Sequence, residues 1–257
     1  GVPAQEQALV NRVVDVLKSG ALKIATIESI ELADAVLVLG EDVTSTAPRV
    51  ALALRQAARG RANELAAKKS VPEWQAIALA DLVQRDKHPL YVLSVEATRL
   101  DDVARKTWQA TPEDIARAGF AIANQIDAQA PTSANINADL VAEIAQTLKQ
   151  AKRPLIVSGT GVQSQTVLDA AINIAKALKT QNEAVEVVLA VPEVNSIGLA
   201  MMGAAPLDDA LDALSRSDAA DVVAVVLEND LYRRASKARV DAALRSCKLL
   251  VVDPQAT

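Results

Sequence analysis

The chain has 257 residues, of which 51% are hydrophobic and only 2% aromatic, and its formal net charge is −5 at pH 7. This length and apolar content are sufficient for a large buried core, so the chain is predicted to be globular. The negative charge removes the electrostatic basis for binding nucleic acid, and no apolar run reaches the roughly 18 residues that a membrane span needs. We therefore expect no nucleic-acid partner and no direct membrane insertion.

The first half of the chain shows apolar runs of strand length between segments with helical periodicity. The predicted elements are, in chain order, a helix over 5–18 closed by Gly20, a strand over 36–39, a helix from Pro48 to about Arg59, an Ala-rich helical insertion at about 60–86, a strand over 88–95 and a helix from the cap Thr111 to about Asp127. The polar stretch at about 130–137 is the predicted linker.

The second half continues the alternation. Its predicted elements are a helix over 140–151, a strand over 155–157, a helix over 167–178, a strand over 185–191, a helix over 207–214, a strand over 222–227, a helix over 237–245 and a strand over 249–252. Strands that alternate with helices favour a doubly wound, mainly parallel α/β sheet.

Two segments share one plan, which predicts two related halves. In both 33–55 and 220–245, Ala-Asp precedes an apolar strand, Glu with Asp or Asn follows it, and Arg-Val and then Ala-Leu-Arg lie on the next helix. We therefore predict two Rossmann-like lobes, the first over 1–130 and the second over 138–257. The chain starts without methionine and stops just past an apolar run, so we interpret it as a piece of a longer protein.

Candidate site residues lie in the loops that follow the strands, because ligands bind beyond the carboxyl ends of parallel strands. Gly159 and Gly161 lie between a strand and a helix, where free N–H groups can bind a phosphate. This loop lacks the third glycine of a dinucleotide fingerprint and the Gly-Lys-Ser/Thr of a P-loop, so a tight strand-to-helix turn is the favoured interpretation.

Acidic and amide residues occupy the equivalent tips of the two halves. They are Gly40, Glu41 and Asp42 in the first half, and Glu228 and Asn229 in the second. Such groups can receive ribose hydroxyls or guanine N–H groups, or they can cap the next helix. Capping is favoured, because negative residues repel phosphate.

Neither metal nor catalytic residues are predicted. No spacing of carboxylates resembles a calcium loop. The only histidine, His88, precedes a proline at a strand start and is expected to be structural. The only cysteine, Cys247, excludes an intrachain disulfide and an iron-sulfur cluster held within this chain by several thiolates.

Two segments resemble the molybdopterin oxidoreductase family. They are 153–163, Arg-Pro-Leu-Ile-Val-Ser-Gly-Thr-Gly-Val-Gln, and 195–203, Asn-Ser-Ile-Gly-Leu-Ala-Met-Met-Gly. The resemblance implies the molybdopterin oxidoreductase fold and adds Asn195 to the candidate loop residues. The family's active molybdenum enzymes usually carry an acidic residue before Met-Gly, where this chain has Met201. We therefore expect none of the loop residues to bind a cofactor, and a fold kept as a scaffold.

A closer resemblance is to the G-subunit family of bacterial NADH:quinone oxidoreductase, respiratory complex I, in its C-terminal region. The segments 34–44 and 226–231 are the most specific, with 88–102 and 152–160 in support. The resemblance implies a peripheral protein on the cytoplasmic side of the inner membrane, with other peripheral-arm subunits as partners. It also implies iron-sulfur clusters, 4Fe-4S and 2Fe-2S, upstream of this region, which carry electrons from NADH toward quinone.

The sequence predicts a non-catalytic scaffold region within that family, and two alternatives stay open. One is a molybdopterin-guanine-dinucleotide-binding domain of a molybdenum oxidoreductase. The other rests on 152–178, which is similar to the central nucleotide-binding domain of thiamine-diphosphate enzymes, although their Gly-Asp-Gly diphosphate site appears nowhere in the chain.

Overall fold

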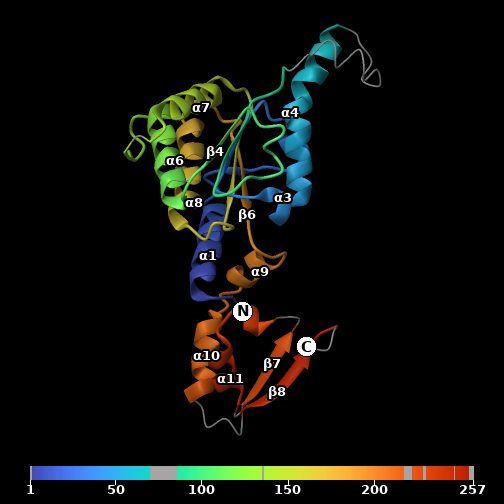
Figure 1. The fold of residues 1–257 in the computed structure, drawn as a ribbon, viewed down its shortest axis with the longest axis vertical. Helices are drawn as coiled ribbons and strands as arrows, with labels where there is room; N and C mark the ends of the chain where they lie inside the picture. The colour runs from blue at the N-terminus through green and yellow to red at the C-terminus, as the bar shows by residue number, and fades with distance from the viewer. Residues whose placement is uncertain are drawn as a thin grey trace. The chain divides into compact units, whose positions relative to one another are not determined.

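The computed structural model describes residues 2–69, 86–134, 136–216, 222–227, 230–245 and 247–254. The chain divides into two compact units (Figure 1). The large unit comprises Val13–Val194, and the small unit comprises Gly1–Arg12 together with Asn195–Thr257.

The large unit is built on a six-stranded sheet with the strand order β1-β6-β5-β2-β3-β4. The strands are β1 (Lys23–Ile24), β2 (Ala35–Leu39), β3 (Leu90–Ser94), β4 (Lys106–Gln109), β5 (Pro154–Gly159) and β6 (Glu186–Ala190). Every neighbouring pair is parallel. The predicted parallel α/β architecture is confirmed.

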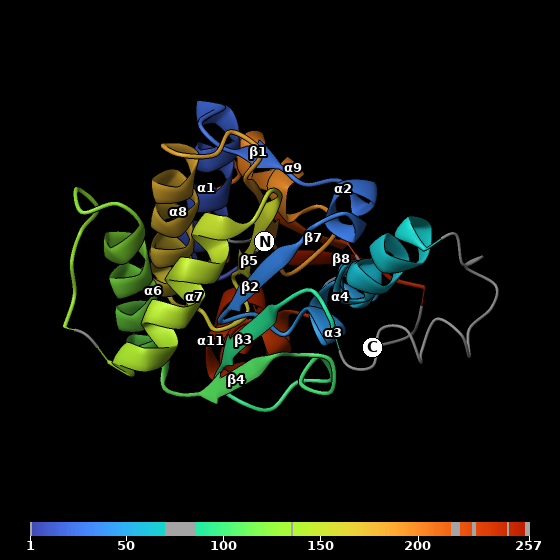
Figure 2. The same cartoon turned by 90° about the horizontal axis from the view of Figure 1, so that it is seen from above.

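Helices cover both faces of this sheet (Figure 2). They are the Val13–Ser19 part of α1 (Ala4–Ser19), α2 (Ile27–Glu31), α3 (Val43–Thr46), α4 (Pro48–Lys68), α6 (Pro112–Ile126), α7 (Ala138–Gln150) and α8 (Gln165–Lys179). Alternate residues of β2 therefore enter different cores. Leu37 and Leu39 pack in the cluster that contains α6, α7 and α8, whereas Val36 and Val38 pack in the cluster that contains α4. A continuous apolar run is what a strand covered on both faces requires.

Local signals in the sequence set several helix ends as predicted. Gly20, with φ +60°, follows the last residue of α1. The Thr111 side chain accepts a hydrogen bond from the backbone N–H of Asp114 and caps α6. Glycine tolerates the left-handed backbone that ends a helix, and a threonine oxygen satisfies a free N–H at a helix start.

The structure differs from the predicted elements in two respects. The helix that begins at Pro48 continues to Lys68 instead of ending near Arg59, so it takes in 60–68 of the predicted insertion, whereas 70–85 lie outside the described residues. The short elements β1, α2, α3 and β4 of the large unit were not predicted, and neither were α9 (Ser196–Met201) and the 3-10 helix η2 (Leu231–Arg233) of the small unit. β1 and these helices are too short for a periodic pattern, and β4, an edge strand of sequence Lys-Thr-Trp-Gln, has no apolar run.

The predicted boundary at 130–137 is wrong as a division between lobes, because the sheet of the large unit continues across it. Ala35 in β2 pairs with Pro154 in β5, and β6 follows beyond β5. β5 pairs with β2 on one side and with β6 on the other, and helices cover both of its faces, because Ile156 packs in the core of α6, α7 and α8 whereas Leu155 and Val157 pack in the core of α4. The stretch around 130–137 therefore connects two helices, α6 and α7, of one unit.

The small unit contains a second, two-stranded parallel sheet. Its elements are α9 (Ser196–Met201), α10 (Leu207–Arg216), β7 (Val223–Leu227), the 3-10 helix η2 (Leu231–Arg233), α11 (Lys237–Leu244) and β8 (Lys248–Val252). Ion pairs join parts of this unit: the guanidinium of Arg239 in α11 lies 2.8 Å from the Asp212 carboxylate in α10, and that of Arg234 lies 3.3 Å from the carboxylate of Glu6, which belongs to the Gly1–Arg12 segment. In the described ranges, no helix combines the length and the apolar character needed to cross a bilayer.

Candidate functional site

The carboxyl ends of β2 and β5 define the candidate site of the large unit. From β2 the chain proceeds to β3 on one side, while β5 and β6 lie on the other side. The connection order thus reverses between β2 and β5, and in open α/β sheets this switch point is the position at which ligands bind. The structure brings together five of the predicted site residues here: Gly40, Glu41, Asp42, Gly159 and Gly161.

The carboxylate of Glu41 occupies this switch point. Glu41 is only 1% exposed. Its Oε2 accepts a 2.8 Å hydrogen bond from the backbone N–H of Gly161, and its Oε1 accepts a 2.7 Å hydrogen bond from the Thr46 hydroxyl. The N–H group that a phosphate would use at this loop is therefore bound to a side chain of the chain itself.

The protonation of Glu41 is shifted by its surroundings. Burial disfavours the charged form and raises the pKa of Glu41 above its ordinary value of 4.5. The hydrogen bonds from Thr46 and Gly161 act in the opposite direction but do not outweigh burial. The site is thus a desolvated carboxyl group held by two donors.

The glycines of the site make room for this carboxylate. A Cβ atom at Gly161 would lie 2.7 Å from Glu41 Oε1, and one at Gly159 would contact Glu41 Oε2 and lie 2.6 Å from the backbone oxygen of Ala190. Gly40, which has φ +70°, adopts a backbone conformation that L side chains rarely adopt. Gly159 and Gly161 therefore leave room for the Glu41 side chain.

Asp42 has a different task from Glu41. It is the N-cap of α3, and its carboxylate accepts hydrogen bonds from the Thr44 backbone N–H at 3.1 Å and the Ser45 hydroxyl at 2.8 Å. Burial opposes ionisation of Asp42, but the hydrogen bonds from Thr44 and Ser45 prevail, so its pKa falls below the ordinary 3.8. Asp42 therefore has the capping role that the sequence favoured.

The remaining predicted site residues do not add to this cluster. Asn195 belongs to the small unit, where it occupies the N-cap position of α9 without a side-chain hydrogen bond to that helix. Glu228 and Asn229 lie outside the described residues. The next residue, Asp230, caps η2 by accepting a 3.0 Å hydrogen bond from Tyr232 N–H, which matches the role of Asp42 in the first half.

Two residues of the site were missed from the sequence. Thr46 donates to Glu41, and the buried Ser158 donates a 2.8 Å hydrogen bond from its hydroxyl to the backbone oxygen of Leu39, which ties β5 to the end of β2. The hydroxyl-rich run at 44–46 was a possible signal for Thr46, since buried carboxylates need donors. Nothing in the local sequence indicated the contact of Ser158.

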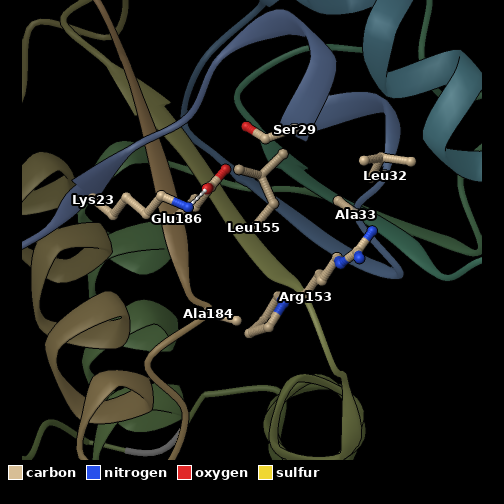
Figure 3. A pocket seen from close by; sticks show the side chains of 9 residues that line it. Lys23, Ser29, Leu32, Ala33, Arg153, Leu155, Ala184 and Glu186 are labelled. Atoms are coloured by element: carbon tan, nitrogen blue, oxygen red, sulfur yellow. Dashed lines mark ion pairs between the residues drawn. The ribbon is translucent and has the colours of Figure 1, made fainter.

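A surface recess of about 260 Å³ lies at the opposite ends of the strands, at the amino ends of β1, β5 and β6 (Figure 3). The Nζ of Lys23 and the Oε1 of Glu186 face one another there at 2.6 Å, and Arg153 and Leu155 also line the recess. Because the lysine is already paired and the recess lies away from the carboxyl ends of the strands, it is the weaker candidate for a ligand site.

His88 lines a second recess, together with Glu64 and Gly60. Its Nε2 lies 3.6 Å from Glu64 Oε1, and its backbone N–H donates to the Ala58 oxygen at 3.1 Å. These contacts join β3 to α4, which agrees with a structural role. Among the described histidine, cysteine, aspartate and glutamate residues, no group of three could hold a metal ion.

The fold defines a Rossmann-like α/β protein. A chain in the crystal structure of the formyltransferase/hydrolase complex (FhcABCD) from Methylorubrum extorquens in complex with methylofuran matches 99% of this chain and 66% of its own length, with a TM-score of 0.60 and 12% identity. At this identity the match supports the fold alone. A search of family models found no match.

Curated relatives define the family. The NADH-quinone oxidoreductase G subunit of Salmonella typhimurium is 49% identical to this chain, and that of Escherichia coli K12 is 48% identical. Both alignments extend over 261 residues and cover the whole of this chain. The Pseudomonas fluorescens relative is 45% identical over 98% of the chain. The chain spans 28% of the length of these relatives. It belongs to the G-subunit family of NADH-quinone oxidoreductase and corresponds to a fragment of that subunit.

Proposed function

We propose that this chain is a structural, non-catalytic segment of the G subunit in NADH-quinone oxidoreductase, respiratory complex I. The full-length subunit takes part in electron transfer from NADH to quinone, and the neighbours of this segment are other subunits of the peripheral arm on the cytoplasmic side of the membrane. The observation that carries the proposal is the carboxylate of Glu41, which binds Gly161 N–H where a cofactor phosphate would bind.

The residues at the switch point do not fit a pterin dinucleotide. A phosphate there would compete with the buried Glu41 for the same N–H group and would lie beside a second carboxylate, that of Asp42. Negative charges placed next to one another in a desolvated site repel strongly. We therefore derive no chemistry through a molybdenum cofactor, and we place the iron-sulfur clusters of the subunit outside this segment.

A ligand-binding experiment tests the absence of a nucleotide site. Guanosine diphosphate, titrated into the full-length subunit by calorimetry, is expected to give no heat attributable to this segment, either in the wild type or in Glu41→Gln. The amide of that variant would accept from Gly161 N–H and donate to the Thr46 hydroxyl, so the side chain still fills the site. Binding by the wild type that is lost in Gly161→Ala would contradict the proposal and favour the pterin-dinucleotide alternative.

A second experiment separates scaffold from electron carrier. Ile144, which is fully buried in the large core, is replaced by alanine in the full-length subunit, with the exposed Leu52→Ala as the matched control. Loss of a buried isoleucine destabilises a fold by about 2–5 kcal/mol. We expect less assembled enzyme for Ile144→Ala but an unchanged NADH:quinone turnover per assembled complex. A lower turnover at normal assembly would overturn the scaffold role.

A further inference from the structure

The sheet of the small unit exposes apolar residues of the kind that are buried in the large unit. β7 reads Val-Ala-Val-Val-Leu and β8 reads Lys-Leu-Leu-Val-Val. β2, with the similar sequence Ala-Val-Leu-Val-Leu, is buried at every position because strands flank it and helices cover both of its faces. In contrast, Val225 in β7 is 54% exposed and Leu250 in β8 is 53% exposed.

The pairing register shows that these exposed residues form one face. Val223 pairs with Lys248, Val225 with Leu250 and Leu227 with Val252, so these six side chains point to the same side of the sheet. Five of the six are apolar, and each of the five is at least half exposed. We call Val223, Val225, Leu227, Leu250 and Val252 the open face.

The opposite face is partly covered within the small unit. Ala224 and Val226 are half-buried and line an apolar groove with Leu207 and Leu211 of α10, and this groove also reaches Val225 and Leu227. Leu249 and Val251 of β8, on the same face as Ala224 and Val226, remain 47% exposed. Among the described residues, the elements of the unit therefore leave the open face at least half exposed and cover the opposite face only in part. Parallel sheets occur almost entirely with both faces covered, and a two-stranded sheet alone is marginally stable in water.

The two strands of this sheet also have the composition of central strands, although each has a free edge among the described residues. Among the described residues, β7 and β8 pair only with each other. Natural edge strands carry charges or prolines that prevent further pairing, whereas β8 presents four apolar residues in succession after Lys248. Both strands therefore have the composition of strands with neighbours on each side.

We propose that the open face and the free edges of β7 and β8 are covered by helices and parallel strands from parts of the same polypeptide that lie outside these 257 residues. The relatives supply that material, because the chain spans only 28% of their length. Parallel strands are joined by crossover connections within one chain. A second copy related by a two-fold axis would instead pair β8 with its equivalent in the antiparallel sense. This inference is independent of the proposed scaffold role.

Site-specific photo-crosslinking in the full-length subunit within the assembled enzyme tests the proposal. Val225→p-benzoylphenylalanine and, separately, Leu250→p-benzoylphenylalanine are illuminated, and the crosslinked peptides are mapped by mass spectrometry. The expected product joins the open face to a peptide of the same polypeptide outside this segment. Tyr232→p-benzoylphenylalanine, 54% exposed but outside the sheet, is the control, and it should give this product in at least tenfold lower yield.

Each other outcome contradicts the proposal. A crosslink to a second copy, to another subunit or to residues within this segment identifies a different occupant, and no crosslink at either position indicates an open surface. Hydrogen exchange of the unmodified full-length subunit provides a measurement without substitution. We expect the β8 amides to exchange at least 100-fold more slowly than exposed loop amides, and equal rates would overturn the proposal even if both variants failed to accumulate.

Discussion

At the scale of single residues, the candidate site depends on one carboxyl group in an apolar surrounding. Glu41 receives hydrogen bonds from Gly161 and Thr46, yet its pKa stays raised because burial removes the water that would stabilise the ionised form. Asp42, the next residue, has a lowered pKa because its hydrogen bonds outweigh a smaller burial. The contributions of these two neighbouring carboxyl groups to stability therefore change with pH in opposite directions.

This contrast predicts the pH dependence of stability. A folded-state pKa above 4.5 means that Glu41 costs no stability below pH 4.5 and costs more as the pH rises through its folded pKa. The isosteric Glu41→Gln variant should therefore become more stable relative to the wild type as the pH rises. The difference in the free energy of unfolding should grow by about 1.4 kcal/mol per pH unit between pH 4.5 and the folded-state pKa of Glu41. Urea unfolding from pH 4 to pH 8 measures this difference.

Asp42→Asn is the matched control for that experiment, and its sign is opposite. The lowered pKa of Asp42 contributes stability above pH 3.8 that is lost as the pH falls through the folded value. Asp42→Asn should therefore be less stable than the wild type at neutral pH. A difference between Glu41→Gln and the wild type that does not change with pH would contradict the desolvated state of Glu41.

The glycines beside Glu41 give a double-mutant prediction. Gly161→Ala should destabilise the fold by about 1–3 kcal/mol, as overpacking usually does, because the new methyl group meets the Glu41 carboxylate. In the Glu41→Ala background this penalty should nearly vanish. Gly159→Ala should stay destabilising in both backgrounds, since its methyl group also meets the backbone oxygen of Ala190. Urea denaturation of the four variants and their parents checks this, and equal coupling at both glycines would refute it.

At the scale of elements, the helix starts follow from local chemistry. Thr111 caps α6 by accepting a hydrogen bond from Asp114 N–H, and Pro112 occupies the first turn. Thr111→Ala should lower the free energy of unfolding by about 1 kcal/mol, whereas Thr111→Ser keeps the oxygen and should change it little. Thermal or urea unfolding distinguishes the two. Equal stability of the alanine and serine variants would show that the cap contributes nothing.

Elements without a strong periodic pattern were the ones that the sequence missed. β4 is an exposed edge strand with mixed polar residues, and it becomes a strand because Tyr91 to Ser94 of β3 offer it a free edge. The continuation of α4 past Gly60 was also missed. Gly60 lies against His88 there, because a Cβ atom at Gly60 would be 3.1 Å from the His88 ring. A helix interior normally disfavours glycine, so a local reading ends the helix there.

At the scale of the whole molecule, the two units differ in how completely their strands are covered. β2 and β5 are central strands buried at every position, whereas every residue of β8 is exposed. In the isolated 257-residue chain, the β2 and β5 amides should therefore exchange at least tenfold more slowly than those of β7 and β8. Mass-spectrometric hydrogen exchange measures this. Equal protection of the two sheets would show that the small unit is stable without further cover.

The sequence by itself determined the parallel α/β class, most helices and strands, the cap residues and the resemblance to its family. These follow from apolar periodicity and from contacts a few residues apart, as at Thr111 and Gly20. Only the tertiary structure decided that β5 joins the sheet of β2, and that Glu41 reaches Gly161 across 120 residues of sequence. Which distant strands pair depends on which strand edges remain free, and on how the helices cover the faces, once the chain is compact, and no local pattern encodes that.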